Sequence, residues 1–100
     1  MIIVRYNRKE ATMTIKGHAQ TAPKGEDLVC AAASTLGFTL VAVAQDEAGK
    51  FLPSISQRSG ELRVSCKPTT ASKRVMDTIF TGYELLSNQY PDAVRADKED

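Results

Sequence analysis

The chain has 100 residues, of which 42% are apolar and 25% charged, and this composition suits one globular domain with its own core. Its formal net charge of +1, with no concentrated basic patch, predicts no binding of nucleic acid. The longest apolar run, residues 38–44, falls short of the roughly 20 residues that span a bilayer, and Arg5 interrupts any signal-peptide core. We therefore expect a cytoplasmic protein without a membrane partner.

The first predicted elements are two strands. Residues 2–6 are rich in β-branched side chains, and residues 12–16 alternate between apolar and polar. The polar link at residues 7–10 predicts an antiparallel hairpin. Gly17 ends the second strand and leads into a loop that contains His18, the single histidine of the chain.

A helix is predicted after this loop. Pro23 and Gly25 disfavour regular structure before it, and Asp27 is a suitable N-cap. Apolar residues then recur at three- and four-residue spacing until a stop at residues 46–49.

With Asp27 as N-cap, Cys30 occupies the third helical position. Backbone N–H groups there lack partners, and the positive end of the helix dipole stabilises a thiolate. The loop histidine and this cysteine are therefore a candidate general base and nucleophile. Asp27 could cap the helix or orient His18, and the sequence leaves both roles open.

Two more strands and a second helix follow. Residues 51–57 and 61–67 are strand candidates, joined by a short polar turn. Residues 71–90 have the strongest helical periodicity in the chain, and Pro91 ends it.

The order of the predicted elements is ββαββα. It indicates an α+β fold in which a four-stranded antiparallel sheet is covered by two helices. We expect a single domain over residues 1–96, and a disordered tail over the charged residues 97–100.

The second cysteine, Cys66, alternates with Leu62 and Val64 on an apparent core face, so we expect it to be buried. Two cysteines and one histidine fall short of a structural zinc set, and we expect neither a metal nor a cofactor. A thiol redox protein is a weaker alternative, because the strand position of Cys66 disfavours pairing with Cys30.

Specific residues also carry a resemblance. Gly17-His18-Ala19, then residues 25–32 (GEDLVCAA), then Ser34, resemble the signature of the bacterial ribosomal-processing cysteine protease family (Prp). The spacing of histidine and cysteine matches the family without insertion or deletion. The end of the second predicted helix, residues 83–91, is also similar, so the resemblance covers nearly the whole chain.

The resemblance implies a homodimeric cytoplasmic endopeptidase without a cofactor. Such enzymes remove a short N-terminal extension from a large-subunit ribosomal protein, and phage relatives process capsid or scaffold proteins. By the same resemblance Cys30 would be the nucleophile and His18 the general base. The supporting residues would be Asp27, Ser34, Gly17 and Gly25.

Each supporting residue also has a purely structural interpretation. Ser34 could bond only to its own helix backbone, and the two glycines could serve only the backbone shape. Where the family usually has a glycine, an aromatic residue and an acidic residue, this chain has Gln20, Thr21 and Pro23. A divergent or phage-borne protease, or a peptide-binding module that does not cut, therefore remains an alternative.

Overall fold

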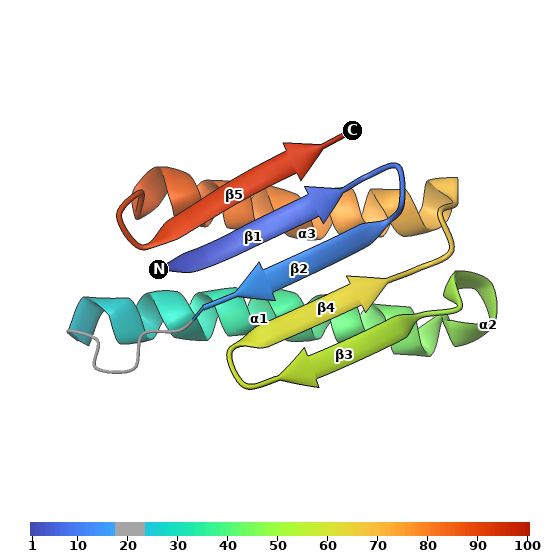
Figure 1. Ribbon diagram of the computed structural model, residues 1–100, viewed down its shortest axis with the longest axis horizontal. Coiled ribbons are helices and arrows are strands. Elements are labelled where there is room, and N and C mark those ends of the chain that lie inside the picture. The colour runs from blue at the N-terminus through green and yellow to red at the C-terminus, as the bar shows by residue number, and fades with distance from the viewer. Residues whose placement is uncertain (18–23) are drawn as a thin grey trace.

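The computed structural model of the chain describes residues 1–17 and 24–100, and of residues 24–27 only the backbone. It has an α+β fold in which one sheet carries the helices on a single face (Figure 1). The elements in chain order are β1 (Ile2–Asn7), β2 (Thr12–Lys16), α1 (Lys24–Asp46), α2 (Ala48–Phe51), β3 (Ser54–Arg58), β4 (Glu61–Ser65), α3 (Thr70–Gln89) and β5 (Val94–Glu99).

The sheet has five strands in the order β3-β4-β2-β1-β5. The β1–β2 hairpin is antiparallel, as predicted, and the pairs β2–β4 and β3–β4 are also antiparallel, whereas β5 runs parallel to β1 with Ile2 opposite Val94. The prediction of a four-stranded antiparallel sheet with two helices is therefore wrong, because the described residues form a mixed five-stranded sheet and three helices. Residues 97–99, predicted to belong to a disordered tail, form the end of β5.

The core lies between the sheet and its two long helices, α1 and α3. Alternate strand residues point into it, and Val4, Met13 and Val64 are completely buried. The helices pack closely against each other, because Gly82 of α3 lies where an added Cβ would come within 2.7 Å of a Leu36 methyl group of α1.

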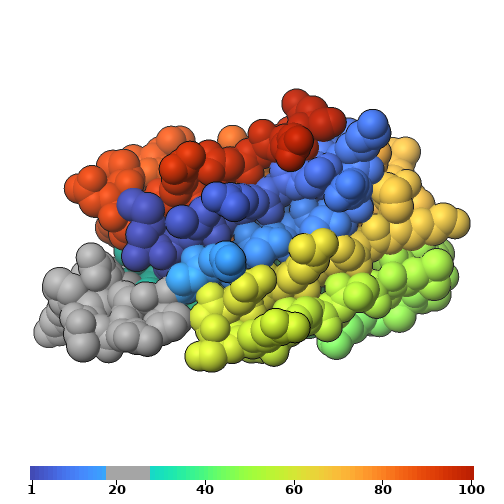
Figure 2. All heavy atoms as spheres, viewed as in Figure 1, coloured from blue at the N-terminus to red at the C-terminus, as the bar shows by residue number. Residues whose placement is uncertain are grey.

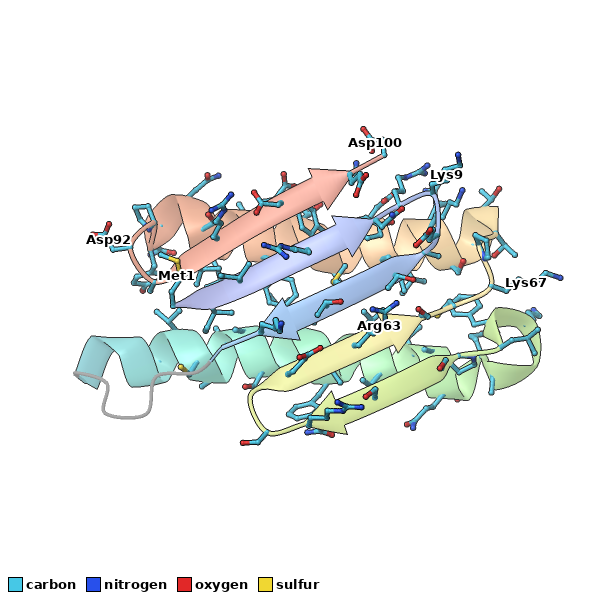
Figure 3. All side chains as sticks on the ribbon, viewed as in Figure 1. Met1, Lys9, Arg63, Lys67, Asp92 and Asp100 are labelled. Atoms are coloured by element: carbon cyan, nitrogen blue, oxygen red, sulfur yellow. The ribbon has the colours of Figure 1, made fainter. Side chains whose placement is uncertain are left out.

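None of the described helices covers the opposite face of the sheet, which faces the viewer in Figure 2. Most of its side chains are polar, as expected for a sheet face in contact with water. Arg5, Thr14 and Arg63 are neighbours across β1, β2 and β4, and Arg63 is labelled on β4 in Figure 3.

The helix α3 agrees with the prediction for residues 71–90. Thr69 caps it by accepting a hydrogen bond from the Ser72 backbone N–H at 3.1 Å, and the Ser72 hydroxyl accepts one from the Thr69 N–H at 3.0 Å. A stripe of buried residues at helical spacing faces the sheet. It comprises Met76, Ile79, Phe80 and Tyr83.

The helix α1 begins earlier than predicted. Its first residue is Lys24, so Asp27 lies inside the first turn and is not the N-cap, and Cys30 lies in the second turn. Backbone N–H groups in the second turn have partners within the helix, so the expected position of Cys30 among free N–H groups is wrong. Gly25 did not prevent the earlier start because a helical glycine costs only about 1 kcal/mol.

The span Leu28–Asp46 of α1 is long and apolar enough to cross a membrane by length and composition, with mean hydropathy 1.8. A helix packed on a sheet can pass the same test, and in this fold Val29, Ala33 and Leu40 pack into the core.

The strand predicted at residues 51–57 is shorter in the structure. Phe51 belongs to the short helix α2, and Leu52 has a left-handed backbone with φ of 45°. Extended structure therefore begins only after Pro53, at Ser54.

Candidate active site

A cavity of about 270 Å³ lies between α1 and the ends of β1, β2 and β4. It is smaller than the roughly 300–1,000 Å³ typical of small-molecule sites, so its size suits one or two side chains of a peptide. Its lining residues are Ile2, Ile15, Gly17, Cys30, Ala33, Ser34, Gly37, Phe38, Gln57, Arg58, Gly60, Glu61, Leu62 and Tyr83.

One side of α1 forms the long wall of this cavity. The lining residues of α1 recur at three- and four-residue intervals, which places them on one helix face. Cys30, a half-buried free thiol, stands at the start of this wall, and Ser34 follows one turn later. Phe38 stands at the far end. The residues between the two ends are small, and this leaves the cavity open along the helix.

The side of the cavity that faces the core is apolar. It is formed by Ile15 of β2, Leu62 of β4 and Tyr83 of α3. The Tyr83 hydroxyl donates a hydrogen bond of 2.8 Å to the Ala33 carbonyl oxygen, one turn after Cys30. Burial raises the pKa of Tyr83 well above its ordinary value, so its hydroxyl stays protonated as this donor.

The rim of the cavity is polar and comes from the hairpin of β3 and β4. Gln57, Arg58 and Glu61 line it, and the Lys16 amine lies 3.8 Å from a carboxylate oxygen of Glu61. An apolar interior with a charged opening matches a peptide that inserts an apolar side chain and leaves its polar neighbours near water.

Gly17 joins this site through its backbone. Its φ of 103° is a conformation that suits glycine, and an added Cβ would collide with the Met1 carbonyl oxygen. Its N–H donates a 2.8 Å hydrogen bond to the Gly60 carbonyl, which ties the end of β2 to the β3–β4 turn.

The structure thus brings Gly17, Cys30 and Ser34 of the predicted set to one cavity. Gly25 and Asp27 lie in the first turn of α1, where only the backbone is described. His18 lies outside the described residues, so its predicted role stays a prediction.

Several lining residues were not predicted from the sequence. Ile2, Leu62 and Tyr83 look like ordinary core positions in the sequence, and only the strand order brings them beside Cys30. The turn glycine at position 60, between the two polar strand ends, was the only local signal for the rim.

The second cysteine is separate from this site. Cys66 is buried after β4, as predicted, and its N–H donates to the Ala11 carbonyl at 2.9 Å. Burial also raises the pKa of the Cys66 thiol. Within the described part of the chain, no group of three His, Cys, Asp or Glu side chains is arranged to hold a metal ion.

Solved structures of bacterial proteins have the same fold. One is the essential ribosomal processing protease Prp from S. aureus in complex with a substrate peptide, which is 20% identical and has a TM-score of 0.84 over 99% of this chain and 100% of that chain. The same protease with a covalently linked product peptide has a TM-score of 0.83 at the same identity and coverage. SMU.848 from Streptococcus mutans is 22% identical, with a TM-score of 0.77 over 99% of this chain and 94% of that chain.

A search of curated proteins finds no significant match. A family model described as "Cysteine protease Prp", however, matches residues 1–95, which is nearly the whole chain and includes the wall that carries Cys30. The chain therefore belongs to the Prp family of cysteine proteases.

Proposed function

We propose that this protease is a cytoplasmic endopeptidase that removes a short N-terminal extension from a large-subunit ribosomal protein. Cys30 is the nucleophile in this proposal and His18 the general base. The observation that carries it is a free, half-buried thiol at the head of a cavity sized for a peptide side chain, in a chain of the Prp family. The S. aureus complex with a substrate peptide, which has the same fold, supports a peptide as the ligand.

The reaction uses the cysteine in two steps. His18 takes the Cys30 proton, and the sulfur attacks the peptide carbonyl to form a tetrahedral intermediate. That intermediate collapses as His18 protonates the leaving amine, which leaves a thioester on Cys30. Water, deprotonated by His18, then hydrolyses the thioester and restores the thiol.

Ser34 and Tyr83 support the nucleophile in different ways. Ser34 lines the cavity one turn after Cys30, within reach of a bound peptide backbone. Tyr83 fixes that turn of α1 through its hydrogen bond to Ala33, so the helix presents Cys30 from a rigid support.

We further propose that the protease works as a homodimer through the outer face of α1. Exposed residues recur there at alternating spacings of three and four, as in a helix that pairs with another, and residues 28–45 contain no charged side chain. Leu28 is 72% and Phe38 51% exposed. The Thr35 hydroxyl bonds to the Ala31 carbonyl at 2.9 Å, so its hydrogen-bonding need is met within the helix. The face comprises Leu28, Ala31, Thr35, Phe38, Ala42 and Gln45.

The dimer is tested by placing a charge on this face. Phe38→Glu should convert a dimer to a monomer in light scattering coupled to size exclusion. Leu85→Glu, on the exposed side of α3 where Leu85 is 64% exposed, is the matched control and should leave the mass unchanged. A wild-type protein that stays monomeric at high concentration would refute this interface.

The reaction is tested with peptides that span the N-terminus of the host's candidate ribosomal protein. Wild type and Cys66→Ala should cut at one bond identified by mass spectrometry, while Cys30→Ala and His18→Ala should not. Equal cleavage by Cys30→Ala would refute the role of Cys30. Binding without cleavage by every form would instead indicate a peptide-binding module, and cleavage of capsid or scaffold peptides alone would indicate a phage-type protease.

Thiol alkylation separates the two cysteines in the wild-type protein. The raised pKa of Cys66 and its burial predict that it reacts slowly at neutral pH. Loss of cleavage should therefore follow modification of Cys30, as read by peptide mapping. If activity instead fell in step with Cys66 labelling, the assignment of the nucleophile would be wrong.

A further inference from the structure

The wall of the cavity lacks a side chain at Gly37, two turns of α1 after Cys30, or about 10 Å along the helix axis. Every other wall residue carries a side chain, whereas here the helix backbone itself lines the cavity. Leu62 of β4 and Tyr83 of α3 also meet the helix at this position.

The surroundings of Gly37 are tight. A Cβ added there would lie 3.1 Å from a Leu62 methyl carbon, 3.1 Å from the Tyr83 hydroxyl oxygen and 3.8 Å from a methyl carbon of Ile15. The first two distances are shorter than ordinary van der Waals contacts, so a side chain at position 37 would force one neighbour to move.

The two close neighbours differ in their freedom to move. The Tyr83 ring is completely buried, and its hydroxyl is held at 2.8 Å from the Ala33 carbonyl oxygen. Leu62 is only partly buried and its side chain lines the cavity, so its terminal methyl groups can turn into that space. A methyl group at position 37 would therefore push the Leu62 side chain into the cavity and reduce the cavity volume.

We infer that Gly37 sets the size of the substrate side chain accepted beside the scissile bond. Because position 37 has no Cβ, the Leu62 side chain can stay against the helix, and the cavity keeps room for a large apolar side chain that extends from Cys30 along α1. Position 37 is thus a specificity-determining position of the site, and this role rests on the proposed function. Small apolar side chains do not need this room, so their cleavage does not depend on position 37.

The test compares a set of otherwise identical peptides that carry Ala, Val, Leu or Phe at the residue before the scissile bond. Gly37→Ala should keep kcat/KM for the Ala and Val peptides within about twofold, and lower it for the Phe peptide by about tenfold or more, which is the usual effect of one methylene on pocket fit. Gly49→Ala is the matched control, because a Cβ on that helical glycine meets no atom within 4 Å. It should leave all four values unchanged.

Leu62→Ala tests the same idea in the opposite direction and does not depend on the folding of the glycine variant. It widens the cavity at the contact with Gly37, so the ratio of Phe to Ala cleavage should rise. If neither variant changes that ratio, or if Gly37→Ala lowers all four values equally, Gly37 does not determine specificity.

A binding measurement distinguishes failure of the proposed function from failure of the inference about Gly37. In a Cys30→Ala background, fluorescence anisotropy with the same peptides gives their order of affinity without turnover. A preference for Phe that Gly37→Ala removes would support the inference even if no peptide were cut. No preference in binding, together with normal cleavage, would overturn the inference and leave the protease intact.

Discussion

The two long helices lie on the same face of the sheet but differ in composition. α3 buries one stripe of side chains and exposes charged residues, such as Arg74 and Glu84, on the other side. In α1, residues 28–45 carry no charge at all, although Leu28 and Phe38 are exposed. Figure 1 shows α1 behind β2, β4 and β3, and α3 behind β1 and β5.

The difference shows which features the fold alone explains. Burial against the sheet requires one apolar stripe, and α3 has that stripe, with charged residues and the exposed Leu85 on its outer side. α1 carries small residues on the side of the cavity and uncharged residues on the exposed side, and neither is needed to hold the sheet. We assign the peptide site to the cavity side of α1 and the dimer contact to its exposed side.

The largest expected effect is the difference in stability loss between a core variant of α3 and a surface variant of α1. Phe80 of α3 is 2% exposed, with its ring centroid 5.4 Å from that of Tyr6. Phe80→Ala should lower the free energy of unfolding by about 3–5 kcal/mol because it leaves a cavity in the core. Phe38→Ala on α1, which removes a half-exposed ring, should cost about 1 kcal/mol or less in dilute solution. Urea denaturation followed by circular dichroism measures both.

On association of the dimer, the variant with the smaller effect on stability, Phe38→Ala, should have the larger effect. Phe38→Ala should weaken the dimer, so its midpoint of unfolding should no longer rise with protein concentration as that of wild type does. Equal losses of stability for the two variants at low concentration would show that Phe38 is a core residue of the monomer, and the contrast between the helices would not hold.

Local pattern predicted most of the fold. β-branched runs and alternation located β1, β2 and β4, and periodicity located α3 to within one residue at each end. β5 was missed because its residues 95, 97, 98 and 99 are charged and only Val94 is buried. It forms a strand because β1 offers it a parallel partner, which is a tertiary cause that a local pattern does not contain.

Only those residues of the candidate site that lie close together in the sequence could be predicted from it. Cys30 and Ser34 were found because they share a helix and a family signature. Leu62 and Tyr83 come from elements far away in sequence, and they meet Gly37 only because β4 lies next to β2 and α3 packs against α1. The start of α1 differs from the prediction because Gly25, in the first turn, lowers helix stability by only about 1 kcal/mol.

A smaller effect is expected at the contact by which α3 supports α1. Tyr83→Phe removes the hydrogen bond to Ala33, whose carbonyl keeps its partner within the helix, so the loss of stability should be about 1 kcal/mol. Tyr90→Phe, at a more exposed tyrosine, is the control and should have no comparable effect. A cost of 3 kcal/mol or more would mean that the bond does more than join the two helices.

The same tyrosine predicts the response to alkaline pH. Burial raises the pKa of Tyr83 above the usual value near 10, and burial with the neighbouring Asp77 carboxylate does so for Tyr6. The stability they contribute is complete below pH 10 and is lost as pH rises through the folded-state pKa. Wild type should thus unfold more easily above pH 10, and Tyr83→Phe should flatten that loss in denaturation measured from pH 8 to 11. An unchanged slope in the variant would mean that Tyr83 ionises as freely in the folded as in the unfolded chain.

The smallest expected effect distinguishes a threonine that caps a helix from two that lie on helix surfaces. Thr69 accepts the Ser72 N–H at the start of α3, so Thr69→Ala should cost about 1 kcal/mol. Thr78 of α3 and Thr35 of α1 are exposed, and each bonds to a carbonyl of its own helix at 2.9 Å. Alanine favours helix formation slightly more than threonine, so at either position it should change the stability of the monomer by less than about 0.5 kcal/mol.

Only Thr35 lies on the uncharged face of α1, so only Thr35→Ala should also change the concentration dependence of thermal unfolding. If Thr78→Ala changed that dependence equally, the dimer contact would have to include α3 as well as α1.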